Sequence, residues 1–133
     1  MKLSFLLLFQ FMFFVAFGQS KVFVYYFDAD FNPTIKSKAI VMGRGIKTEN
    51  GVIVNFFNTK TGKVFNICSY SDSTLAILNG DNSEYYDNGK LKKSETFSNN
   101  VLNGITQSWD STGLLIDSIV YENDKMQNSL GER

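Results

Sequence analysis

The sequence contains no histidine, and this absence removes most of the common catalytic and metal-binding arrangements. A Ser-His-Asp triad, a Cys-His pair and a His-ligated metal site all need an imidazole ring. Few enzyme mechanisms remain, and glycoside hydrolysis by a pair of carboxylates is one of them. Acidic residues such as Glu84, Asp87 and Glu95, however, fall in expected turns or alternate with lysine, which is typical of the solvated face of a sheet. We therefore expect a protein that is not an enzyme and that holds no metal and no cofactor.

Cysteine is nearly absent as well. Cys68 is the only one, so the chain cannot close an internal disulfide. It lies in an apolar stretch with Val64, Phe65 and Ile67. We interpret it as a small buried hydrophobe rather than as a reactive thiol.

An excess of positive charge is also missing. Thirteen Lys and Arg residues balance thirteen Asp and Glu residues, and the longest basic run is the pair Lys92 and Lys93. Nucleic acids bind to clustered cationic surfaces, because their phosphates carry one negative charge each. We therefore expect no nucleic-acid partner, and binding to acidic membrane surfaces loses support for the same reason.

Residues 1–18 predict a secretory signal peptide. Lys2 precedes an apolar run from Leu3 to Phe17, and the small residue Gly18 suits cleavage before Gln19. The run is shorter than the roughly 20 apolar residues of a membrane span, so we expect no stable membrane insertion after cleavage. An uncleaved anchor is the alternative. The expected location is the periplasm or the cell surface of a bacterium, since an exported chain with one cysteine does not fit a disulfide-stapled extracellular module.

Beyond the signal, the sequence predicts an all-β protein. Apolar and polar residues alternate with period 2, turn residues separate the runs, and no amphipathic helical stretch is present. In residues 19–50 we expect strands at Val22–Phe27 and Ala39–Met42. Between them, Asp28–Pro33 contains the only proline and predicts a turn.

The most informative feature is a repeat with a period of 24 residues. Asn79, Gly80, Tyr85, Gly89, Leu91, Phe97 and Asn99 recur without a gap as Asn103, Gly104, Trp109, Gly113, Leu115, Tyr121 and Asn123. A fixed short period is typical of proteins that stack copies of one small unit, each of which buries its apolar side against the next.

Residues 51–128 divide into three β-hairpins on this pattern. They pair Val52–Phe57 with Lys63–Tyr70, Ser83–Tyr86 with Lys90–Phe97, and Ile105–Trp109 with Leu114–Tyr121. We expect them to form an open, meandering antiparallel sheet. Residues 71–79 lengthen the first unit and predict an elaborated connection or a further short strand, and residues 129–133 predict a polar tail.

Glycines mark the hairpin turns. Gly62, Gly89 and Gly113 stand where a hairpin turn needs a positive φ. In every unit a large apolar residue follows this glycine by two positions, and an aromatic residue follows six positions later. Because six is even, we expect both side chains on the same face of the strand.

The repeat resembles a known family. The pattern Gly80-x4-Tyr85-x3-Gly89-x-Leu91-x5-Phe97-x-Asn99-x4-Gly104 is similar to the bacterial variant of the MORN repeat, and residues 85–91 are the closest stretch. Asn100 and Asp124 stand where many copies of that repeat have glycine. Such repeats occur in antitoxin-like proteins and in exported bacterial proteins. The resemblance implies a protein-binding or structural module with a partner of unknown identity; the alternative is an immunity or antitoxin-like partner of an exported toxin.

Aromatic residues that recur in the units form the candidate binding surface. These are Phe57, Tyr85, Trp109 and Tyr121. Stacked hairpins place equivalent residues in ladders, so a buried or half-buried ladder is the more common arrangement. A platform that stacks on sugars, peptides or a partner's strand is the alternative.

Overall fold

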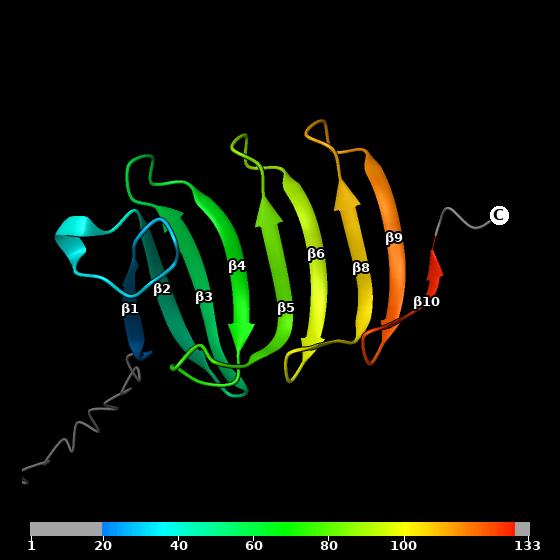
Figure 1. Cartoon of the computed structure of the whole chain (residues 1–133), viewed down its shortest axis with the longest axis horizontal. Coiled ribbons are helices and arrows are strands. Elements are labelled where there is room, and N and C mark those ends of the chain that lie inside the picture. The colour runs from blue at the N-terminus through cyan, green and yellow to red at the C-terminus, as the bar shows by residue number, and fades with distance from the viewer. Residues whose placement is uncertain (1–19, 130–133) are drawn as a thin grey trace, which may run out of the picture.

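A computed structural model of the chain describes residues 20–129. The expected signal peptide (1–18) and residues 130–133 of the expected tail lie outside the described residues. The described part is all-β, with one open antiparallel sheet whose strands lie side by side from β1 to β10 (Figure 1). The strands are β1 (Val22–Phe27), β2 (Val41–Thr48), β3 (Gly51–Asn58), β4 (Val64–Tyr70), β5 (Leu78–Tyr85), β6 (Leu91–Ser98), β7 (Val101–Leu102), β8 (Gly104–Trp109), β9 (Leu115–Glu122) and β10 (Lys125–Ser129). Within residues 20–129 the one helical element is a short 3-10 turn at Lys36–Lys38.

The second strand differs from its prediction. β2 begins at Val41 and continues through Gly43 and Gly45, where we expected the strand to have ended. The reason is close packing. A Cβ atom at Gly43 would lie 3.1 Å from Cγ1 of Val54 and 3.3 Å from Cδ2 of Tyr25. These glycines therefore make room for neighbouring side chains and do not mark a chain reversal.

The sheet has two unlike faces. We call the face that carries Tyr25, Val54 and Cys68 the inner face, and the opposite one, which carries Phe57, the outer face; the strand register sets both. The apolar core lies on the inner face and consists of Val41, Val52, Val54, Phe56 and Cys68, of which Val54 is fully buried.

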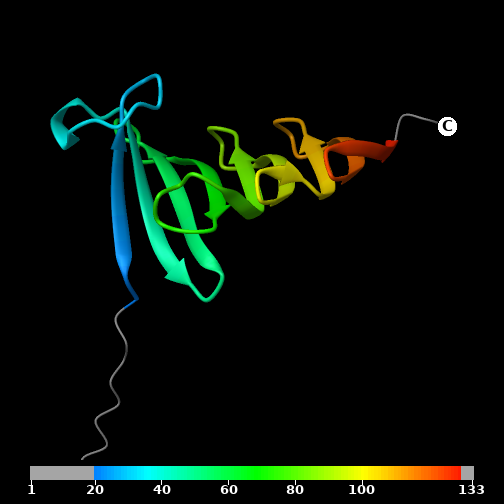
Figure 2. The same cartoon turned by 60° about the horizontal axis from the view of Figure 1, so that its bottom comes forward.

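Two loops cover this core. Phe31, from loop 28–34, packs against Phe56 and Phe65 with ring centroids 6.3 Å apart in both cases. The loop 71–77, which joins β4 to β5, packs Leu75 against the core, and its Ser73 carbonyl accepts a hydrogen bond of 2.9 Å from the Tyr25 hydroxyl. Figure 2 shows this loop crossing the sheet and the strands β5 to β9 bending along their length.

Each repeat unit contains a β-bulge that reverses one expectation. The register shifts between Phe56 and Phe57, between Glu84 and Tyr85, and between Ser108 and Trp109. The extra residue lies on β4, β6 or β9, soon after the turn glycine. Strand residues before it therefore lie on the opposite face of the sheet from the one that simple alternation predicts. Leu91 therefore pairs with Tyr85 on the outer face, while Phe97 pairs with Gly80 on the inner face. The expectation that both leave the same face is wrong.

The hairpin turns adopt left-handed backbone conformations. Gly62, Gly89 and Gly113 have φ angles of +67°, +81° and +96°. At the opposite ends of the hairpins, Asn99 and Asn100 have φ angles of +50° and +68°. Asparagine tolerates this region better than other residues that carry a Cβ.

Asn100 and Asp124 clamp consecutive units together. The backbone N–H of Leu78 donates to Oδ1 of Asn100 at 2.7 Å, and the N–H of Asn100 donates back to the Leu78 carbonyl at 2.8 Å. Asp124 makes the same pair of bonds with Leu102, at 2.6 and 2.8 Å. The side-chain acceptor explains why these positions are not glycine, which would keep the turn but lose the clamp.

Loss of one clamp is expected to weaken the stack measurably. Asn100→Ala removes the acceptor for Leu78 and the Nδ2 donor to the Ala76 carbonyl, a 3.3 Å bond. Asn99→Ala is the matched control, because Asn99 also has a positive φ and its side chain makes no hydrogen bond to the described residues. We expect Asn100→Ala to lower the free energy of unfolding by about 1–2 kcal/mol more than Asn99→Ala does. Urea unfolding followed by Trp109 fluorescence measures both; equal losses would show that the clamp contributes nothing.

Candidate functional site

Three of the four predicted surface residues share the outer face. Phe57, Tyr85 and Trp109 lie at or next to the ends of β3, β5 and β8, each beside a bulge and close to a turn. All three are half-buried. Tyr121 pairs with Gly104 on β9 and lies on the inner face. The structure therefore brings Phe57, Tyr85 and Trp109 together in what we call the outer row, and it places Tyr121 on the other face.

The outer row borders an apolar depression of about 530 Å³. Val64, Ile67, Tyr85 and Tyr86 line it together with the turn 87–89. The Tyr86 hydroxyl donates a 2.8 Å hydrogen bond to the Trp109 carbonyl, which ties this unit to the next. Val64 was not among the sequence-predicted surface residues, because the bulge that turns it outward leaves no plain signal in the pattern.

Side chains from one hairpin turn form hydrogen bonds to the next turn beside the outer row. Lys63 Nζ donates to the Asp87 carbonyl at 2.9 Å, and Lys90 Nζ donates to the Thr112 carbonyl at 2.6 Å. Asn88 Nδ2 bonds the Ser111 carbonyl at 2.9 Å. The three turns are thus linked side by side.

A polar ladder crosses the inner face of the middle strands. Cys68 Sγ lies 3.0 Å from Oδ1 of Asn82, and Nδ2 of Asn82 donates to Oε2 of Glu95 at 3.2 Å. Lys93 Nζ lies 2.5 Å from Oε1 of Glu95. Asn82 and Glu95 are each only 8% exposed. The interpretation of Glu95 as part of a solvated face is therefore wrong: the residue lies opposite Asn82 at the centre of the bent strands and is paired on both oxygens.

The Cys68 thiol is held in its neutral form. Burial raises its pKa to about 11, a hydrogen bond from Tyr70 acts in the opposite direction, and the negative charges of Glu84 and Glu95 add to the rise. The thiol is consequently protonated at neutral pH and donates to Asn82. A nucleophilic cysteine needs the thiolate, so the geometry suits a structural role.

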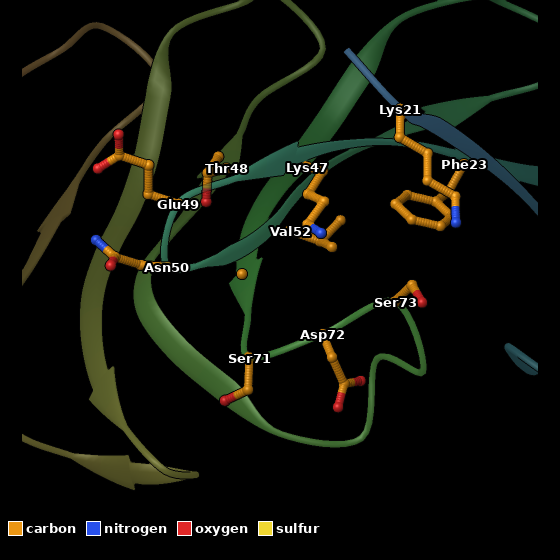
Figure 3. A pocket seen from close by; sticks show the side chains of 11 residues that line it. Lys21, Phe23, Lys47, Thr48, Glu49, Asn50, Val52, Ser71, Asp72 and Ser73 are labelled. Atoms are coloured by element: carbon orange, nitrogen blue, oxygen red, sulfur yellow. The ribbon is translucent and has the colours of Figure 1, made fainter.

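A second, charged depression lies at the far end of the inner face (Figure 3). It has a volume of about 420 Å³ and is formed by the start of β1, the turn between β2 and β3, and the loop that begins at Ser71. Two basic residues, Lys21 and Lys47, and two acidic residues, Glu49 and Asp72, line it. The Asp72 carboxylate accepts hydrogen bonds from the hydroxyl and the N–H of Thr74, which lower its pKa. With both signs of charge present, this depression favours neither anions nor cations.

Among residues 20–129, no group of three or more His, Cys, Asp or Glu side chains is arranged to hold a metal ion. In the same range, none of the helical structure has the length and apolar character required to cross a bilayer. Comparison of the chain with known protein families, with curated proteins and with solved structures gives no match.

Proposed function

We propose that the protein is an exported, non-enzymatic MORN-variant repeat protein that binds another protein through the outer face of its sheet. The observation that carries this proposal is the row of Phe57, Tyr85 and Trp109, which are half-exposed and repeat with the units on one face. Tyrosine and tryptophan contribute most to protein interfaces, because they offer large apolar areas together with a polar group.

The rigidity of the outer row favours binding. The lysine and asparagine bonds between turns hold neighbouring units in register. A surface that is already ordered loses little conformational entropy when a partner docks. The depression beside Tyr85 offers a place for an apolar side chain of that partner.

The state of the polar groups supports a non-enzymatic role. Glu95, the most buried carboxylate among the described residues, is engaged by Asn82 and Lys93. The Cys68 thiol is neutral and bonded. Groups that are fully engaged with one another have no free base or nucleophile to offer to a substrate.

Affinity capture tests the proposal. Tagged protein from Gln19 onward is incubated with bacterial envelope extract, beside a Trp109→Ala variant and a Tyr121→Ala control on the inner face. We expect to capture a protein with the parent and with Tyr121→Ala but not with Trp109→Ala. Circular dichroism first establishes that both variants are folded. A partner retained equally by both variants would contradict the outer-face assignment. If the partner is an exported toxin, the role narrows to that of an immunity protein.

A further inference from the structure

The inner face holds an apolar cavity beneath the two covering loops. It has a volume of about 540 Å³, within the range of roughly 300–1,000 Å³ that small-molecule sites occupy. Its apolar walls include Tyr25, Phe27, Phe31, Phe56, Tyr70 and Leu75. The cavity is on the opposite face from the outer row, so it stands apart from the proposed protein-binding surface.

Both covering loops place a bulky residue in a strained backbone conformation at this cavity. Phe31 and Leu75 each have a φ angle of +60°. The other non-glycine residues with positive φ in the described chain are asparagine or aspartate, which tolerate it. Strain of this kind persists only where the surrounding structure imposes it, and it gathers at binding sites.

A similar set of hydrogen bonds, made by an aspartate, fixes the backbone at each strained residue. The Asp28 carboxylate accepts the N–H groups of Asp30 and Asn32 at 2.9 and 3.0 Å, and the N–H of Phe31 donates to the Asp28 carbonyl at 3.2 Å. In the other loop Asp72 bonds Thr74, and the N–H of Leu75 donates to the Asp72 carbonyl at 3.4 Å. An aspartate three residues earlier thus fixes the apolar side chain in both loops.

The charge around the cavity selects against anions. The residues that line it include no lysine, arginine, aspartate or glutamate. Asn66 also lines the cavity, and its buried Oδ1 accepts no hydrogen bond from the described residues. Rotation of this amide would present an acceptor to a ligand that carries a donor.

We propose that this cavity binds a small uncharged molecule with an aromatic or branched apolar body and one hydrogen-bond donor. The aromatic walls supply the apolar contact, and Asn66 accepts the donor. Acids are disfavoured, because a wall without cations would leave their charge buried and unpaired. Phe31, which is 51% exposed, forms the side of the site that faces solvent.

A pair of dyes tests the ligand class. N-phenyl-1-naphthylamine is uncharged, has one N–H group and fluoresces when it leaves water; 8-anilino-1-naphthalenesulfonate has the same rings and a negative charge. We expect saturable binding of the neutral dye with one site per chain, at least about tenfold tighter than that of the sulfonate. Failure of the neutral dye to saturate, or equal or tighter binding of the sulfonate, would overturn the proposal.

A matched pair of variants tests the place. Phe31→Ala removes a wall of the cavity, whereas Ile35→Ala removes an apolar side chain that is 62% exposed and does not line it. Both residues are exposed, so both variants are expected to fold. We expect Phe31→Ala to weaken binding of the neutral dye about tenfold and Ile35→Ala to leave it unchanged. Equal effects of the two substitutions would place the dye on the general surface and refute the site.

Discussion

Replacing Phe56 by alanine is expected to lower the free energy of unfolding by about 3–5 kcal/mol. Phe56 is only 4% exposed and packs against the Phe27 ring, 6.0 Å away, beneath Phe31. Alanine would remove this apolar contact and leave a void that the two covering loops cannot fill. Since small domains are stable by only about 5–15 kcal/mol, the variant is expected to be largely destabilised.

The next residue supplies the control for this prediction. Phe57 has the same side chain but lies on the outer face and is half-buried. Phe57→Ala is therefore expected to lose less than half as much free energy of unfolding as Phe56→Ala. Urea denaturation of both variants gives the comparison. If Phe57→Ala were as costly as Phe56→Ala, the assignment of the core to the inner face would be wrong.

Alanine at Gly51 is expected to cost about 3 kcal/mol or more. Gly51 begins β3 with a φ of +150°, a conformation that other residues rarely adopt. A Cβ atom there would overlap the carbonyl oxygen of Tyr70 and lie 3.1 Å from that of Ser71. Backbone atoms of β4 cannot turn aside as a side chain does, so the two strands would have to separate.

Gly62→Ala separates this clash from the cost of the backbone conformation alone. Gly62 has a φ of +67°, and a Cβ atom there meets nothing within 4 Å. We expect a loss of only about 1–2 kcal/mol, the ordinary cost of a left-handed alanine. Thermal melting and urea titration of the two variants measure the difference between their free energies of unfolding. A Gly51→Ala protein as stable as Gly62→Ala would mean that β3 and β4 do not approach as closely as described.

The backbone of this protein is well encoded in local patterns. The apolar and aromatic run Val22–Phe27 coincides with β1. The three expected hairpins correspond to β3 with β4, β5 with β6, and β8 with β9. Gly89 and Asn99 have the positive φ angles that their turns require. These features depend on neighbouring residues alone, which is why a single sequence is enough to predict them.

The two faces were harder to predict, because one bulge changes the parity of a strand. Tyr121 follows the turn glycine at an even spacing from Leu115, yet the register shift beside Trp109 puts the two on opposite faces. Glu95 has the alternation of a solvated charge, but its partners come from β5 and from its own strand, which bury it. The alternation of apolar and polar residues predicts neither the face of Tyr121 nor the burial of Glu95.

Some missed features did leave a signal. Asp124 follows Asn100 by the repeat period, and each clamps the leucine 22 residues before it. The strand β10 (Lys125–Ser129), which we did not expect, begins one period after β7. Its polar composition obscured it. The cavity left no such trace, because it depends on how loops 28–34 and 71–77 fold over the sheet.

Site-specific cross-linking shows whether a protein partner docks on the outer face. A photoreactive benzoylphenylalanine is placed at Tyr85 on the outer face or at Tyr121 on the inner face, two half-buried tyrosines on opposite sides of the same sheet. After irradiation in bacterial envelope extract, we expect a discrete protein adduct from position 85 and none from position 121. An adduct from position 121 alone, or no adduct from position 85, would rule out binding of a protein partner through the outer face.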